Sequence, residues 1–259
     1  MLATATLRHS RLASHLASIV RSWEDVPLLQ RLLRIDATTL APASTAGAQL
    51  EFIGVDGVGK TTLFNASVAR LRSRWLFPHN LPLDAPLPTL DRDAILGHRR
   101  ILEDSLLRID RDGTDHRWWL IRARQLTVVC HRSLHSCDRR LPRGIAHHEG
   151  LFKNCAESVL ALDTEVERLW RDRCFVHLRF EDPSLVVGRL EQRHACRSIP
   201  FDRHAILDQV LRQRDVMESL ARRAVDLGRP ILPLQAEDDF QTLVRRVVDF
   251  QSSIGGEDA

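Results

Sequence analysis

A glycine-rich segment, Gly54–Thr62, limits the folds open to this chain more than any other feature. It reads GVDGVGKTT and matches every defined position of the pattern G-x-x-x-x-G-K-[ST]. The apolar residues Gln49–Val55 before it are predicted to form a buried strand, and Thr61–Ser73 to form a helix. A glycine loop between a strand and a helix can turn its amide N–H groups toward the oxygens of a phosphate.

Each part of this loop is predicted to contact a different part of a nucleoside triphosphate. Lys60 is expected to bridge the β- and γ-phosphates, the Thr61 hydroxyl to bind Mg²⁺, and Thr62 to donate to the α-phosphate. The predicted cofactors are therefore ATP, or another nucleoside triphosphate, and Mg²⁺. The predicted binding residues are Gly54, Asp56, Gly57, Val58, Gly59, Lys60, Thr61 and Thr62.

The distribution of basic residues singles out Lys60. The chain has 37 lysines and arginines, yet lysine occurs only at positions 60 and 153. A compact ammonium group on a flexible stem differs chemically from the planar guanidinium used elsewhere. We therefore interpret Lys60 as a chemical requirement of the loop.

Bulk properties argue against several classes of function. A formal net charge of +3 does not by itself predict nucleic-acid binding, which needs clustered cations. No apolar run approaches the roughly 18 residues of a membrane helix. Five cysteines without paired spacing favour reduced thiols and a cytoplasmic location. A zinc site is disfavoured because its candidate ligands, Cys130, His131, His135 and Cys137, match no standard zinc spacing.

Strand and helix signals alternate along the chain after residue 48, where a predicted helical N-terminal extension (residues 1–48) ends. For residues 49–259 this alternation predicts a three-layer α/β fold of the P-loop NTPase type with a mostly parallel, five-stranded sheet. The predicted strands are Gln49–Val55, Arg74–Phe77, Arg143–His148, Cys174–Arg179 and Pro230–Leu234. The predicted helices are Thr61–Ser73, Asp91–Ile109, Asp115–Ser136, Leu151–Arg171, Pro183–His194, Phe201–Leu227 and Asp238–Gln251.

The loop sequence FIGVDGVGKTTL resembles the nucleotide-binding loop of thymidylate kinases and deoxynucleoside kinases. The segment LIRARQ resembles the thymidylate-kinase helix whose arginine contacts the acceptor monophosphate, which implies that Arg124, and next Arg122, binds the acceptor. The strand CFVHLR and the helix after Asp182-Pro183 resemble the family's fourth strand and lid. That resemblance implies that Arg189 and Arg193 lie over the transferring phosphoryl group. The resemblance to these kinases as a whole extends loosely over residues 49–251.

The chain departs from these families after the third predicted strand. Where they carry an acid–arginine pair, this chain reads His147-His148-Glu149-Gly150. Glu149 is predicted to hold Mg²⁺, directly or through water, or to accept a proton from an attacking hydroxyl. The alternative is an ordinary acid at the start of the next helix. His148 is interpreted as structural, and the acceptor stays open because the thymidylate-kinase acceptor pattern is missing around Pro78–Pro88.

The leading hypothesis is an ATP-dependent phosphotransferase of the nucleoside/nucleotide-kinase type that acts on a small molecule. Its predicted catalytic residues are Lys60, Glu149, Arg189 and Arg193. The alternative is an NTP-hydrolysing regulatory or assembly protein without a small acceptor, whose N-terminal helices contact a partner or a second copy in a homodimer. A nucleotide-binding module without turnover is a third hypothesis.

Overall fold

The computed structural model describes residues 49–70, 75–76, 92–111, 116–135, 144–147, 150–163, 166–171, 173–196 and 201–254. The predicted N-terminal helical extension lies outside them. The described strands form one parallel sheet in the order β2-β3-β1-β4-β5. The strands are β1 (Gln49–Ile53), β2 (Trp75–Leu76), β3 (Gly144–His147), β4 (Arg173–Arg179) and β5 (Ile231–Gln235). The predicted α/β class with a parallel sheet is confirmed.

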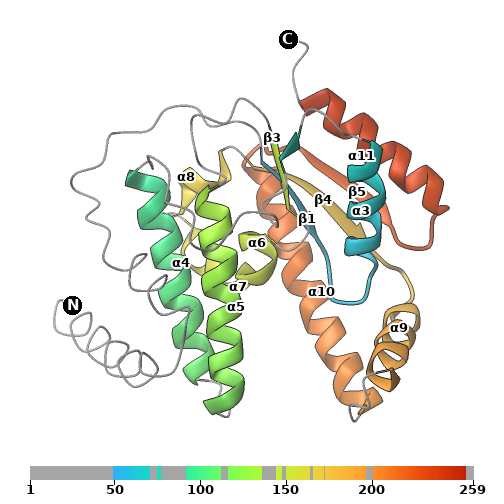
Figure 1. Ribbon diagram of the computed structural model, residues 1–259, viewed down its shortest axis with the longest axis horizontal. Helices are drawn as coiled ribbons and strands as arrows, with labels where there is room; N and C mark the ends of the chain where they lie inside the picture. The colour runs from blue at the N-terminus through green and yellow to red at the C-terminus, as the bar shows by residue number, and fades with distance from the viewer. Residues whose placement is uncertain are drawn as a thin grey trace.

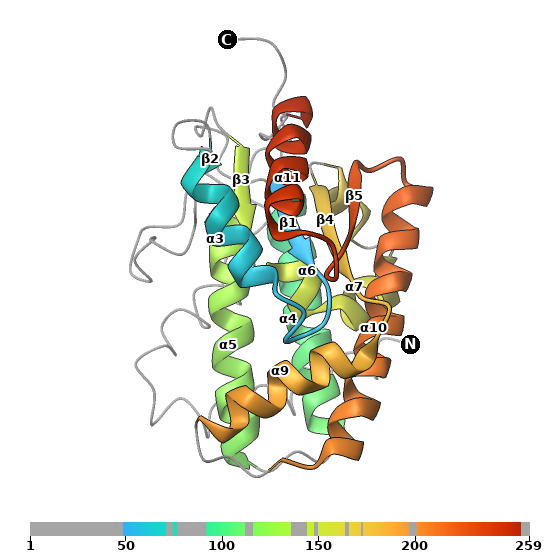
Figure 2. The same cartoon turned by 90° about the vertical axis from the view of Figure 1, so that its right-hand side faces the viewer.

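Helices cover both faces of this sheet (Figures 1 and 2). On one face lie α3 (Lys60–Arg70) and α11 (Phe240–Ile254). On the other face lie α4 (Arg92–Arg111), α5 (His116–His135), α6 (Leu151–Asn154), α7 (Ala156–Ala161) and α8 (Glu167–Trp170). The helices α9 (Pro183–Ala195) and α10 (Arg203–Asp226) connect β4 to β5, and the C-terminal half of α10 packs against α7 and enters the same core as α4 and α5.

The period-two alternation of the strands divides the apolar core in two. Leu50 and Phe52 of β1 enter the core under α3 and α11, together with Val176 of β4. Ile53 and Phe175 enter the core under α4 and α5. Because both faces of the sheet are covered, these strands read as apolar runs rather than as alternating sequences.

The prediction of a single helix over Leu151–Arg171 was wrong. The chain instead forms three short helices, α6, α7 and α8, and leaves the helical conformation at Cys155, where φ is −121° and ψ is 27°. Phe152 packs against both Trp170 and Phe175, with ring centroids 4.7 and 5.5 Å away, and these two rings also contact each other. This aromatic contact folds the segment back onto the sheet, and a single straight helix could not bring Phe152 and Trp170 together.

The sheet order places the glycine loop at a point where the direction of the connections reverses. After β1 the chain adds β2 and β3 on one side and then β4 and β5 on the other. Ligands of open α/β sheets bind at such a switch point, outside the carboxyl ends of the strands. The loop follows β1 directly and therefore opens at this position.

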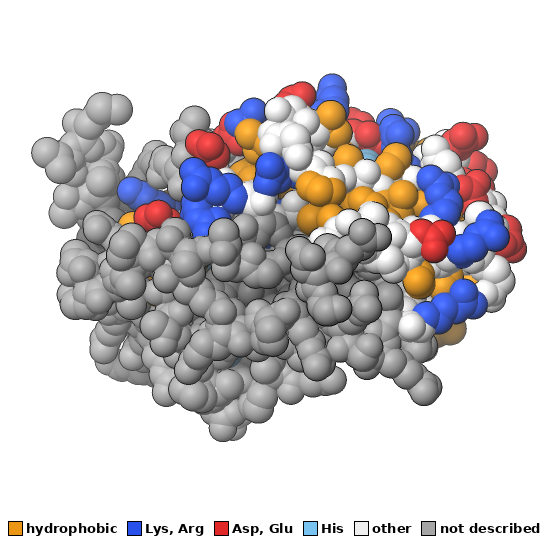
Figure 3. Space-filling view, turned by 90° about the horizontal axis from the view of Figure 1, so that it is seen from above, with side chains coloured by type: hydrophobic (Ala, Val, Ile, Leu, Met, Phe, Trp, Pro, Cys, Tyr) orange, Lys and Arg blue, Asp and Glu red, His pale blue; other side chains and the backbone are white. Residues whose placement is uncertain are grey.

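The described surface mixes charges of both signs. On the face seen from above in Figure 3, basic and acidic side chains lie beside one another around an apolar area. Within the described ranges, no helix has the length and apolar character needed to cross a lipid bilayer, and no cluster of three or more metal-binding side chains occurs. Of the disfavoured zinc ligands, Cys130 and His131 are buried in α5, and Cys137 lies outside the described residues.

Candidate active site

The glycine loop has a backbone that other residues would not tolerate. Gly54 has φ of 140° and Gly57 has φ of 85°, both in the region that disfavours side chains. A Cβ at Gly54 would lie 2.4 Å from the carbonyl oxygen of Leu178, and one at Gly57 would lie 2.9 Å from Cγ of Leu190. The loop is therefore pressed against β4 and α9, and its glycines are required by space as well as by conformation.

Lys60 is held inside the curl of the loop. Its side chain is only 6% exposed, and its ammonium donates to the carbonyl oxygens of Gly54 (2.9 Å) and Val55 (2.6 Å). Thr61 and Thr62 follow in the first turn of α3 and are exposed. The positive end of α3, the ammonium and two hydroxyl groups thus lie together, which is the chemistry that binds a polyphosphate.

One cavity of about 390 Å³ lies beside the loop, and we call it the loop cavity. Apart from loop residues, it is lined by Leu63, Leu178, Arg189, Arg193, Ala236, Phe240 and Leu243. Arg189 donates from Nη1 to the carbonyl oxygen of Val58 at 2.8 Å. Both arginines that the resemblance assigned to a lid therefore line the same cavity as the loop.

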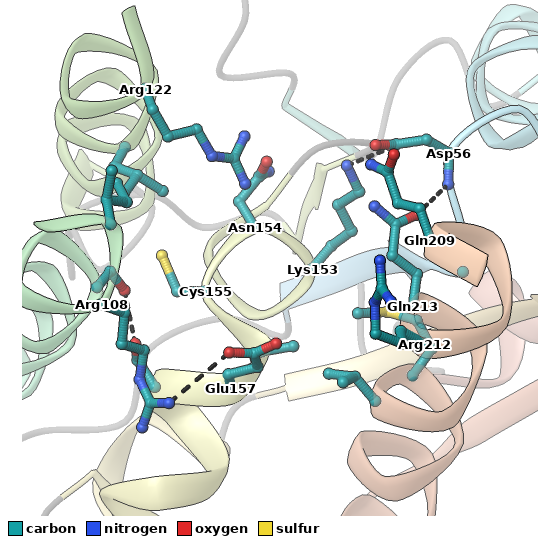
Figure 4. Close-up of a pocket in the computed structure, with 18 residues that line it drawn as sticks. Asp56, Arg108, Arg122, Lys153, Asn154, Cys155, Glu157, Gln209, Arg212 and Gln213 are labelled. Carbon is teal, nitrogen blue, oxygen red and sulfur yellow. Dashed lines mark hydrogen bonds and ion pairs between the residues drawn. The ribbon is translucent and has the colours of Figure 1, made fainter. Parts of the chain in front are cut away.

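A second cavity of about 430 Å³, the helix cavity, lies on the other side of the loop (Figure 4). Its walls come from α4, α5, the α6–α7 segment and α10. Its charged and amide side chains are Asp56, Arg108, Arg122, Lys153, Asn154, Glu157, Gln209, Arg212 and Gln213. Asp56 lines both cavities, so the two meet at the loop.

The two arginines proposed for acceptor binding differ in their positions on α5. Both side chains are exposed, but Arg122 lines the helix cavity and Arg124 is not among the residues that line it. Side chains two residues apart on a helix point in nearly opposite directions, so both cannot face one cavity. Glu149 and His148 lie outside the described residues.

The helix cavity has more positive than negative charge. Arg108 pairs with Asp104 and lies 3.7 Å from Glu157. Arg122 donates to the neutral Gln125, and within the described part of the chain no acid pairs with it or with Arg212. Two guanidinium groups on α5 and α10 are therefore available to an anion in this cavity.

Asp56 is the acid at the junction of the cavities. Its Oδ1 accepts from Nζ of Lys153 at 2.7 Å and lies 3.9 Å from Nζ of Lys60. Burial raises the pKa of Asp56, but the charges of Lys153, Lys60 and Arg122 outweigh it and lower the pKa to about 2. Asp56 is therefore an anion throughout the neutral pH range.

A buried ion pair lies beneath this junction. Glu51 of β1 and Arg173 of β4 are 0% and 1% exposed, and their side chains are 3.2 Å apart. Glu51 also accepts from the backbone N–H of Lys153 at 2.7 Å. Burial raises the pKa of Glu51, and Arg173 lowers it in part.

The sequence interpretation missed Glu51, Arg173 and Lys153. Two signals were present in the chain. One was a carboxylate inside the otherwise mostly apolar strand QLEFI, and the other was the second lysine in a chain that otherwise uses arginine.

No protein-family model matches this chain, and no curated protein matches it either. Among solved structures, the chain is similar to the deoxyadenosine kinase from M. mycoides with bound dCTP. The two are 12% identical with a TM-score of 0.41, over 79% of this chain and 99% of that one. It is also similar to a gluconokinase from Sinorhizobium meliloti 1021, with 14% identity and a TM-score of 0.37, over 82% of this chain and 95% of that one. At this identity neither similarity determines a substrate.

Proposed function

We propose that this protein is an ATP-dependent phosphotransferase that acts on a small anionic acceptor. The observation that carries the proposal is the pair of cavities that meet at the glycine loop and share Asp56. Transfer between two small molecules needs a donor pocket and an acceptor pocket on either side of the migrating group. Hydrolysis by water needs only the first, so the helix cavity favours a transferase over the regulatory NTPase.

The loop cavity fits the donor. Gly54 and Gly57 leave no room for Cβ atoms, Lys60 lies in the curl, and Arg189 and Arg193 bring positive charge from α9. Phe240, 39% exposed at the start of α11, offers a ring for the base. The Thr61 hydroxyl and, in this proposal, Glu149, which lies outside the described residues, would hold Mg²⁺, and the metal would supply positive charge to the triphosphate.

The helix cavity fits an acceptor that carries a carboxylate or a phosphate. Arg122 and Arg212 supply cations, and a volume of about 430 Å³ suits a metabolite of moderate size. Gln209 and Gln213 on α10 offer hydrogen bonds to its neutral parts.

The proposed reaction moves the γ-phosphoryl group from the loop cavity into the helix cavity. The bond between the γ-phosphorus and the β–γ bridging oxygen breaks, and a bond forms to an oxygen of the acceptor. ADP leaves, and the proton of an acceptor hydroxyl is released. Arg189, Arg193 and Lys60 stabilise the charge that spreads over the γ-phosphoryl oxygens during this step.

The test is transfer from γ-labelled ATP·Mg²⁺ to a panel of nucleosides, nucleoside monophosphates, sugar phosphates and hydroxy acids. We expect transfer to an anionic member of the panel, and loss of both transfer and ATP binding in Lys60→Ala. The proposal is wrong if the wild-type protein labels none of them while it hydrolyses ATP in response to a protein or nucleic acid.

Two arginine variants test the acceptor site. We expect Arg122→Met to raise KM for the acceptor about tenfold or more, because a hydrogen bond to a charged group contributes about 1.5–3 kcal/mol. Arg124→Met has the same loss of charge on the same helix and serves as the comparison. The reverse order, with Arg124 important and Arg122 not, would support the assignment from family resemblance and exclude the helix cavity as the acceptor site.

A further inference from the structure

The two lysines of this chain meet at one oxygen atom. All other positive side chains among its 37 basic residues are arginines, and lysine occurs only at positions 60 and 153. In the folded protein Nζ of Lys153 and Nζ of Lys60 both approach Oδ1 of Asp56, at 2.7 and 3.9 Å. Lys60 and Lys153 are far apart in the chain, yet the fold brings both to a single carboxylate. Lysine is also the basic side chain with the more flexible stem.

We propose that Lys153 supplies the second phosphate-directed cation of the transfer site, on the acceptor side, and that Asp56 is the carboxylate it exchanges for the transferring phosphoryl group. This inference rests on the proposed phosphotransferase function. Lys60 lines the loop cavity, Lys153 lines the helix cavity, and Asp56 lines both. The two ammonium groups therefore flank the boundary that the phosphoryl group has to cross. Figure 4 shows the ammonium of Lys153 at the Asp56 carboxylate.

The buried pair Glu51–Arg173 sets the position of Lys153. Glu51 accepts from the backbone N–H of Lys153, so the start of α6 is attached to β1. A Cβ at Gly150 would lie 2.2 Å from the Glu51 carboxyl carbon, which means that this backbone lies directly on the carboxylate. Burying an ion pair rarely adds stability by itself. A role in placing Lys153 explains why the strand carries a charge there.

Charge and side-chain flexibility explain why the lysines would leave Asp56 for the phosphoryl group. Asp56 is held between two cations and has a pKa of about 2, so the junction already stabilises an anion. A γ-phosphoryl group carries more charge than a carboxylate and spreads it over several oxygens. Both lysines can turn from Asp56 to these oxygens by rotation about their flexible stems, whereas a guanidinium is restricted to a planar fork.

The experiment compares Lys153→Met and Lys153→Arg with Arg222→Met, an exposed arginine on α10 that lines neither cavity. The measurements are kcat and KM for transfer from ATP·Mg²⁺ to the reactive member of the panel, the Kd of ATP, and the free energy of unfolding in urea. We expect Lys153→Met to lower kcat about 10²- to 10³-fold, as when one charge-stabilising donor is removed. The Kd of ATP should change less than about threefold. Lys153→Arg should regain only part of the rate, and Arg222→Met should match the wild type.

Asp56→Asn gives a second measurement with the opposite sign. If Asp56 competes with phosphate for the two lysines, its neutralisation should tighten ATP binding severalfold in equilibrium dialysis. An unchanged kcat in Lys153→Met overturns the proposal, as does a parallel fall of kcat, ATP affinity and stability, which indicates a merely structural lysine. Weaker ATP binding in Asp56→Asn overturns the exchange.

Failure of the proposed function gives a different result. If the wild-type protein binds ATP but labels no acceptor, the phosphotransferase proposal fails, and the same variants are compared by their rates of ATP·Mg²⁺ hydrolysis, with water as the acceptor. A 10²-fold loss in Lys153→Met would then still support Lys153 as a phosphate-directed cation, and an equal rate would exclude it.

Discussion

Lowering the pH from 7 to 5 should destabilise this protein through His98, a histidine buried between α4 and α5. His98 is 0% exposed, its Nδ1 lies 2.6 Å from the carbonyl oxygen of Ala94, and its Nε2 lies 2.8 Å from Oγ of Ser133. The same hydroxyl accepts from Arg173. Ser133 therefore has its proton to give to His98, and the neutral imidazole with a proton on Nδ1 satisfies all of these contacts.

The size of the effect follows from the pKa. Burial lowers the pKa of His98 from 6.5 to about 3. The hydrogen bond to Ala94 opposes this shift in part, and the nearby charge of Arg173 adds to it. Between these values the unfolded chain binds a proton that the folded protein does not, so the stability from His98 is present above pH 6.5 and is lost as the pH falls toward 3. From pH 7 to pH 5 the free energy of unfolding should fall by about 2 kcal/mol on this account.

Urea unfolding, followed by tryptophan fluorescence at pH 7 and pH 5, measures this decrease in the free energy of unfolding. His177, whose burial lowers its pKa to about 4, should add to the wild-type loss with the same sign. His98→Gln should reduce the loss between the two pH values by about 2 kcal/mol, and the exposed His204→Gln serves as the control. If His98→Gln shows the same pH dependence as the wild type, His98 is not held neutral and the reasoning fails.

Three further predictions concern the loop and the ion pair beneath the site. Gly150→Ala should lower the free energy of unfolding by about 1–3 kcal/mol in urea, because its Cβ would overlap the Glu51 carboxylate. Glu51→Gln and Arg173→Met should each lower the free energy of unfolding by about 3–5 kcal/mol, because each leaves one buried charge without its partner. The double variant should lose less than the sum of the two, and additive losses would contradict an ion pair. Arg189→Ala should lower kcat about 10²-fold, and an unchanged rate would exclude Arg189 from the reaction.

Much of the fold can be read from local sequence. The loop lies between β1 and α3 as predicted, because glycine conformations, helix starts and apolar runs depend on neighbouring residues. The predicted strand Cys174–Arg179 corresponds to β4, which begins one residue earlier, at Arg173. The segment Leu151–Arg171 was misread because its apolar spacing is helical, whereas its shape depends on the contact of Phe152 with Trp170 and with Phe175 of the next strand.

The site beyond the loop was decided by tertiary structure. The Lys153–Asp56 contact joins residues 97 apart in sequence, and the Glu51–Arg173 contact joins residues 122 apart. No periodicity or spacing rule reports such pairs, because they depend on the order in which the strands lie side by side. The chain by itself determined that Gly54–Thr62 forms a loop suited to a polyphosphate, through the backbone freedom of glycine and one lysine. Only the packing of α5, α6 and α10 around β1 decided which cations stand opposite that loop, since side-chain direction depends on how each element is oriented against its neighbours.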